Sequence, residues 1–165
     1  MKRLIFVRHG KAEDGSLSSI DFERSLTAKG KNVSRRMAMK MREKIKDPGI
    51  LVTSPAFRAI ETAFIFASVY EINHELIKIS GDIYYRFNEK AIIKILKDVG
   101  EEVDTVTMFG HNPTFTELSD FYSSEACYII PKSGIISLLF NTTTWSGIKP
   151  GTGKPELFYK PNQLA

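Results

Sequence analysis

The sequence predicts a three-layer α/β/α sandwich with a mostly parallel central sheet. Two observations lead to this class. Short apolar runs are typical of strands covered on both faces, and segments with an apolar helical stripe alternate with them along the chain. The chain has 165 residues, of which 42% are hydrophobic and 25% charged, which favours one compact domain over residues 1–165. Ligands in such folds bind outside the carboxyl ends of the strands.

The predicted strands and helices alternate in order. Strands are expected where apolar or β-branched residues run together, and helices where apolar residues recur every three or four positions after a capping residue. The expected strands cover residues 4–7, 50–53, 77–79, 105–109, 135–140 and 156–159. The expected helices cover residues 27–46, 55–70 and 88–99, and a further helix begins after residue 113. The first strand is expected at the centre of the sheet.

Local signals mark the ends of these helices. Thr27 and Asn88 are predicted N-caps, because their side-chain oxygens can accept hydrogen bonds from the free N–H groups of a first turn. Ser54 is also a predicted N-cap, with Pro55 at the first helical position. Gly100 is expected to end the third helix.

Composition and charge exclude several classes of protein. The single cysteine, Cys127, excludes an internal disulfide and an all-cysteine metal site, and fits a reducing compartment. The net charge of +4 mildly favours anionic partners, but no basic run is dense enough to indicate nucleic acid. No apolar stretch approaches the ~18 residues of a bilayer span, and Arg8-His9 interrupts the N-terminal apolar run too early for a secretory signal. We expect a cytoplasmic protein that binds neither nucleic acid nor membranes, in an oligomeric state that the sequence leaves open.

Unusual polar residues follow several predicted strands. Arg8, His9 and Gly10 come directly after the first strand, Arg58 lies in the first turn after the second, and His111 follows the strand at 105–109. The ends of parallel strands meet at one sheet edge, so these residues are expected to converge. Predicted helix N-termini add positive dipole ends there. The sum predicts an anion site, most naturally for phosphate.

Each of these side chains has a chemical use at a phosphate. Arg8 and Arg58 can bind phosphate oxygens bidentately and hold their charge through a transition state. A neutral His9 can attack phosphorus and carry the phosphoryl group covalently. A protonated His111 would donate to the equatorial oxygens, and Gly10 lets the backbone approach closely because it has no Cβ. We expect no metal and no other cofactor, because the arginines and an imidazolium supply the positive charge.

Several segments together carry a family resemblance. They are Arg8-His9-Gly10, residues 24–30, residues 53–63, Gly110-His111-Asn112-Pro113 and Pro131-Lys132-Ser133-Gly134. In order and spacing the chain resembles the histidine phosphatase (phosphoglycerate mutase-like) superfamily, and within it the small SixA-type phosphohistidine phosphatases. The resemblance implies that His9 is the phosphorylated nucleophile and that Arg8, Arg58 and His111 surround the phosphate.

The chain departs from the family pattern in two places. Ala12 stands where the superfamily often has a threonine that contacts phosphate, and the large helical insertion that usually brings the proton donor is absent. Arg24 either contacts substrate or braces its loop. Asp82 is the candidate general acid, with Glu13 and Asp14 as alternatives. A phosphohistidine has a labile P–N bond, so weak acid catalysis would be tolerable for that substrate.

These observations predict a metal-independent phosphatase that works through phospho-His9. The favoured substrate is phosphohistidine in a protein. The alternatives are a small-metabolite phosphomonoesterase of the same superfamily and a phosphate-binding module without catalysis. The intact set of histidines and arginines favours an enzyme, because a binding module could lose His9 and keep the arginines.

Overall fold

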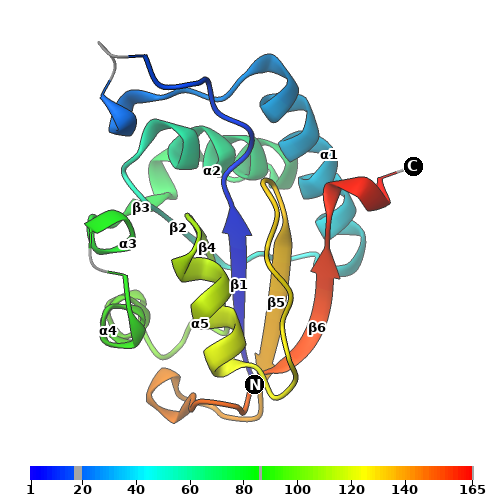
Figure 1. Cartoon of the computed structure of the whole chain (residues 1–165). Coiled ribbons are helices and arrows are strands. Elements are labelled where there is room, and N and C mark those ends of the chain that lie inside the picture. Colours follow the sequence, from blue (N-terminus) through cyan, green and yellow to red (C-terminus); the bar gives the residue numbers. More distant parts are fainter. Residues whose placement is uncertain (17–19, 86, 165) are drawn as a thin grey trace.

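A six-stranded sheet forms the centre of the protein in a computed structural model, which describes residues 1–16, 20–85 and 87–164 (Figure 1). The strands are β1 (Lys2–Arg8), β2 (Ile50–Thr53), β3 (Lys78–Ile79), β4 (Thr105–Gly110), β5 (Ile135–Phe140) and β6 (Lys154–Tyr159), in the spatial order β3-β2-β4-β1-β5-β6. Strands β1 to β4 are parallel, and β5 pairs antiparallel with both β1 and β6. The predicted fold class and the central place of the first strand are confirmed.

Helices cover both faces of this sheet. The helices are α1 (Ala28–Lys44), α2 (Phe57–Tyr70), α3 (Asp82–Tyr85), α4 (Glu89–Val99) and α5 (Thr114–Tyr122). Successive side chains of β1 point to opposite faces. Leu4 and Phe6 pack in one core with α4 and α5, whereas Ile5 and Val7 pack in a second core with α1 and α2. This double burial explains why the strand reads as one continuous apolar run.

The predicted capping residues have mixed outcomes. The Thr27 side chain accepts a hydrogen bond from Gly30 N and that of Asn88 from Ala91 N, so these two N-caps are confirmed. The prediction for Ser54 is wrong, because the N-cap of α2 is Ala56. Ser54 N instead donates to Phe109 O at 2.9 Å and extends the pairing of β2 with β4, so the chain is still leaving the sheet at this residue.

Short elements around the site did not appear in the sequence prediction. These are the 3-10 turn Asp21–Glu23 and the four-residue helix α3. Neither has the apolar period of a longer helix. None of the helices in the described part of the chain has the length and apolarity to cross a bilayer.

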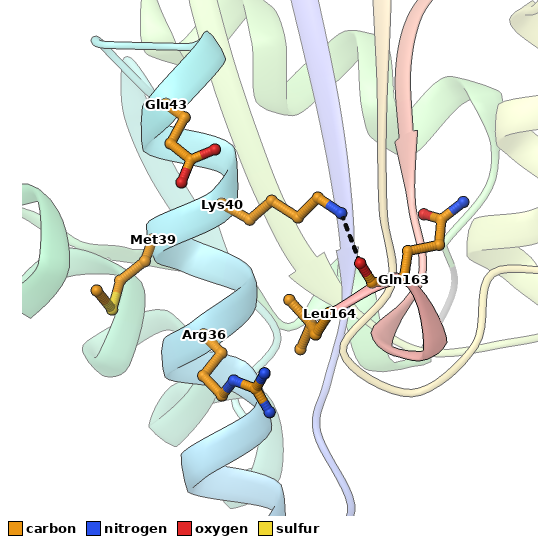
Figure 2. Close-up of a pocket in the computed structure, with 6 residues that line it drawn as sticks. All are labelled: Arg36, Met39, Lys40, Glu43, Gln163 and Leu164. Carbon is orange, nitrogen blue, oxygen red and sulfur yellow. Dashed lines mark hydrogen bonds between the residues drawn. The ribbon is translucent and has the colours of Figure 1, made fainter.

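Gln163 and Leu164 pack against α1 (Figure 2). Lys40 Nζ donates to Gln163 O at 3.1 Å, and the Leu164 side chain lies beside this contact. A pocket of about 320 Å³ lies between the two segments. None of the predicted site residues lines it, so this pocket is separate from the chemistry expected at the strand ends.

Candidate active site

His9 lies directly after β1 and is held from both sides. Its backbone N donates to Gly110 O at 3.0 Å, and its carbonyl oxygen accepts from Ser133 N at 3.1 Å. The ring Nδ1 lies 2.7 Å from Gly10 O. A carbonyl oxygen only accepts, so Nδ1 carries the proton and Nε2 keeps its lone pair. This is the tautomer that a nucleophilic Nε2 requires.

Burial keeps the His9 imidazole neutral. Only 7% of the residue is exposed, and burial lowers its pKa to about 3 against the opposing effect of the hydrogen bond to Gly10. The positive charges of Arg58 and Arg8 and the nearby His111 lower the pKa further. Nε2 is therefore unprotonated throughout the physiological pH range.

His111 follows β4 and faces His9. The two ring centroids are 5.2 Å apart, and His111 Nε2 lies 2.7 Å from Ser54 Oγ. Burial lowers the pKa of His111 to about 4, and the charge of Arg58 lowers it further. His111 is thus neutral at pH 7 unless a dianion beside it raises the pKa again. The protonated His111 expected from the sequence therefore requires a bound anion.

The two arginines approach from different elements. Arg8 ends β1, and its Nη1 donates to Ile130 O at 3.0 Å. Arg58 lies in the first turn of α2, is 6% exposed, and donates from Nη1 to Asp21 O at 2.8 Å and from Nη2 to Asp21 Oδ2 at 3.1 Å. Within the described residues, the buried Nε atoms of both arginines have no hydrogen-bond partner. Each arginine therefore keeps one N–H donor that no other described group uses.

Asp21 is a site residue that the sequence analysis missed. Its Oδ2 accepts from Arg58 and, at 2.8 Å, from the Tyr84 hydroxyl. The hydrogen bond from Tyr84 and the charge of Arg58 lower the pKa of Asp21, so the carboxylate is ionised at pH 7 and orients the guanidinium. Asp21 follows no strand, which is why the strand-end rule did not find it. The one sequence signal in this segment was Arg24, three residues later, which was predicted to contact substrate or to brace its loop.

Arg24 braces the loop that carries Asp21. Its Nε lies 3.0 Å from Asp21 Oδ1, and its Nη1 donates to Glu13 O at 3.1 Å. Of the two roles left open by the sequence, these contacts favour the bracing role.

The pocket beside His111 has a volume of about 550 Å³. Its lining residues are Arg58, Ile83, Tyr84, Tyr85, Phe87, Asn88, His111, Asn112, Pro113 and Thr114. No carboxylate is among these described lining residues. Asp82, the expected acid, begins α3 and accepts instead from Lys94 Nζ at 3.3 Å. Neither Glu13 nor Asp14 lines the pocket, so the structure brings none of the three candidate acids to it.

Gly10 is required by packing at the start of α1. A Cβ on Gly10 would lie 2.6 Å from Ser34 Oγ and 3.0 Å from Gly30 O. We expect Gly10→Ala to destabilise the protein by about 1–3 kcal/mol and to displace His9, because an added methyl group in a packed site forces the backbone to shift. Urea unfolding and kcat/KM measure the two effects. The double variant Gly10→Ala/Ser34→Ala should recover part of the stability, and no recovery would contradict this account of the clash.

Acid should unfold the protein partly through its buried histidines. The pKa values of His9 and His111 fall from 6.5 to about 3 and about 4 on folding, so between these limits the unfolded chain binds more protons than the folded one. Their neutral forms stabilise the fold above pH 6.5, and this contribution is lost as the pH falls. We expect each histidine to lower the free energy of unfolding by about 2 kcal/mol or more between neutral pH and about pH 4.5, since a shift of one pKa unit corresponds to about 1.4 kcal/mol.

Urea unfolding at neutral pH and at about pH 4.5 measures this loss. The variant His9→Asn/His111→Asn should lose clearly less stability on acidification than the wild-type protein. An equal loss in both proteins would contradict the burial of neutral imidazoles.

The strand ends of this sandwich bring two neutral histidines close to two arginines. These are the side chains of a phosphate site with an imidazole nucleophile.

A sequence model of the histidine phosphatase superfamily (branch 1) matches residues 4–92, just over half of the chain. The chain belongs to this superfamily, and the membership supports phosphatase activity. No curated protein matches the chain in sequence.

Solved structures share the fold over nearly the whole chain. The structure of the protein histidine phosphatase SixA complexed with tungstate has a TM-score of 0.80 at 22% identity, covering 99% of each chain. The SixA protein of Agrobacterium tumefaciens has a TM-score of 0.78 at 21% identity, covering 97% of this chain and 98% of its own. The phosphoserine phosphatase of Entamoeba histolytica has a TM-score of 0.66 at 17% identity and full coverage of both chains. These likenesses establish a phosphoglycerate mutase-like fold.

Proposed function

We propose that the protein is a metal-independent phosphatase that removes phosphate from phosphohistidine in a protein, through a phosphoryl group carried on His9. The observation that carries this proposal is the state of His9, whose protonated Nδ1 faces Gly10 O and whose Nε2 is left as a neutral nucleophile. The described residues contain no group of three or more histidine, cysteine or carboxylate side chains placed to hold a metal ion.

The first step transfers the phosphoryl group to the enzyme. His9 Nε2 attacks phosphorus, the bond from phosphorus to the leaving nitrogen breaks, and its electron pair goes to the leaving imidazole, which takes a proton from water. Charge on the three equatorial oxygens is stabilised by Arg8, Arg58 and His111. The unpartnered Nε atoms of the two arginines are donors for this purpose.

The second step returns the enzyme to its starting state. Water attacks the phosphorus of phospho-His9, the P–Nε2 bond breaks, and orthophosphate leaves. Nε2 recovers its lone pair, and the hydrogen bond from Nδ1 to Gly10 O keeps the ring in the same tautomer throughout.

No carboxylate is in the described pocket lining, and the hydrogen bond from Tyr84 and the charge of Arg58 keep the adjoining Asp21 ionised, which favours a substrate with an easy leaving group. An alkyl oxide leaves poorly without a proton donor, whereas the imidazole of a phosphohistidine leaves readily. The likeness to SixA structures supports the same substrate class. The likeness to a phosphoserine phosphatase keeps a small-metabolite phosphomonoesterase as the second candidate, and the non-catalytic module remains the third.

A substrate panel tests the choice between these functions. We expect kcat/KM for a phosphohistidine peptide to exceed that for phosphoserine or a simple alkyl phosphate by about 10²-fold or more, the contribution typical of a general acid that an ester requires. Asp82→Asn should change the phosphohistidine activity less than about twofold, because Asp82 pairs with Lys94 away from the pocket. Robust hydrolysis of alkyl phosphates that collapses in Asp82→Asn would contradict the proposal.

A further inference from the structure

A third pocket, of about 500 Å³, adjoins Arg8. It shares no lining residue with the pocket beside His111. Three cationic side chains, Arg8, Lys132 and Lys160, line it, and its described lining contains no carboxylate. Its charge is complementary to a partner that carries several negative groups.

Large apolar side chains stand exposed beside this basic pocket. Tyr128 is 70% exposed and Ile129, which also lines the pocket, is 74% exposed. The Tyr128 ring stacks parallel to that of Phe158 with centroids 6.3 Å apart, and Lys160 Nζ lies 5.1 and 4.9 Å from the two centroids. Lys160 therefore lies against both aromatic rings. Aromatic side chains are enriched in protein interfaces, and polar and charged groups lie at the rims of such interfaces.

This surface is joined directly to the phosphate site. Ile130 lies between Ile129 and Pro131, and its carbonyl oxygen accepts hydrogen bonds from Arg8 Nη1 at 3.0 Å and from Asn112 Nδ2 at 2.9 Å. Ser133 N, next to Lys132, donates to His9 O. A polypeptide bound along residues 128–132 would therefore lie next to Arg8, the side chain proposed to bind its phosphate.

We propose that Tyr128, Ile129, Lys132 and Lys160 form a docking surface for an acidic segment of the phosphorylated protein substrate. This inference rests on the proposed function and extends it from the phosphohistidine to the chain that carries it. The exposed apolar pair favours a polypeptide over a small anion, because a small anion would leave Tyr128 and Ile129 uncovered. The cations select carboxylates around the phosphohistidine and increase the rate of encounter.

Charge reversal tests the docking surface. The probes are a phosphohistidine peptide flanked by glutamates, the same peptide flanked by glutamines, and free phosphohistidine. In Lys132→Glu/Lys160→Glu we expect KM for the glutamate peptide to rise about tenfold with little change in kcat, because charges at the rim of an interface contribute to binding and not to the chemical step. For free phosphohistidine, KM and kcat should each change less than about twofold. The matched control Lys97→Glu/Lys154→Glu makes the same charge change at two exposed lysines outside this pocket.

A binding measurement separates this inference from the proposed function. Calorimetry with an unphosphorylated glutamate-rich peptide should detect binding to wild type and to the Lys97/Lys154 control, and lose it in the Lys132/Lys160 variant, whether or not phosphohistidine is hydrolysed. Failure of wild type to bind the peptide, or equal binding by all three proteins, would overturn the docking surface. An equal loss of affinity for a small dicarboxylate such as glutarate would overturn it in favour of a small-anion subsite.

Discussion

Replacing His9 with asparagine is expected to reduce kcat/KM by about 10⁴-fold or more, the scale seen when a covalent nucleophile is removed. The reason is that His9 Nε2 is the atom that forms the bond to phosphorus in the proposed reaction, and its ring is held in the required tautomer by Gly10 O. The fold should persist, because within the described residues the His9 ring hydrogen-bonds to the carbonyl oxygen of its own neighbour, Gly10. Steady-state kinetics with a phosphohistidine peptide, together with the unfolding midpoint, measure both effects.

His74→Asn is the matched control for this loss. His74 is an exposed histidine that stacks on Phe64 and contacts Ser68, and it does not line the pocket beside His111. Its replacement should change kcat/KM less than about twofold. Activity that survives in His9→Asn, or an equal loss in His74→Asn, would show that His9 is not the nucleophile.

The second large effect is expected at Arg58. Arg58→Ala should reduce kcat/KM by about 10²–10³-fold, the usual cost of losing one donor to a developing oxyanion. Arg58→Lys should restore little of the activity. The guanidinium uses Nη1 and Nη2 for Asp21 and keeps Nε for phosphate, whereas the single ammonium group of lysine cannot make both sets of contacts. Steady-state kinetics of the two variants measure the loss. Full activity in Arg58→Lys would contradict a role for the planar set of donors on the guanidinium.

Asp21→Asn separates positioning from chemistry at the same place. The amide can still accept a hydrogen bond from Arg58, but the charge that fixes the guanidinium is gone. We expect KM for phosphate-bearing substrates to change more than kcat, with the conservative Asp21→Glu variant restoring part of the loss. A collapse of kcat specific to alkyl phosphates in Asp21→Asn would instead identify Asp21 as a proton donor.

The strand-end rule found the residues that the backbone itself places. His9, Arg8 and His111 lie where β1 and β4 end, and the parallel register of these strands, with Arg8 beside Gly110, brings them together whatever the loops do. Arg58 was found because it lies in the first turn after β2. These positions follow from the order of strands and helices, which the hydrophobic pattern of the sequence indicates.

The residues that the sequence did not reveal depend on loops. Asp21 and Tyr84 meet although 63 positions separate them, and neither belongs to an element with a strong period. The Ser54 prediction failed because its local cap signal competed with continued pairing of the chain to β4. Asp82 matched a local acidic context, but α3 turns its carboxylate toward Lys94. Tertiary packing decides such cases, and no short pattern encodes it.

The most direct test of the central claim is to trap the phosphorylated enzyme. The protein is mixed briefly with a phosphohistidine peptide labelled in its phosphoryl group, quenched in alkali, and digested to locate the label. The account predicts a base-stable, acid-labile phosphate on His9 of the wild-type protein and none in His9→Asn. A wild-type protein that takes up no label from this peptide or from any ester in a broad panel, or that carries its label on another residue, would contradict it.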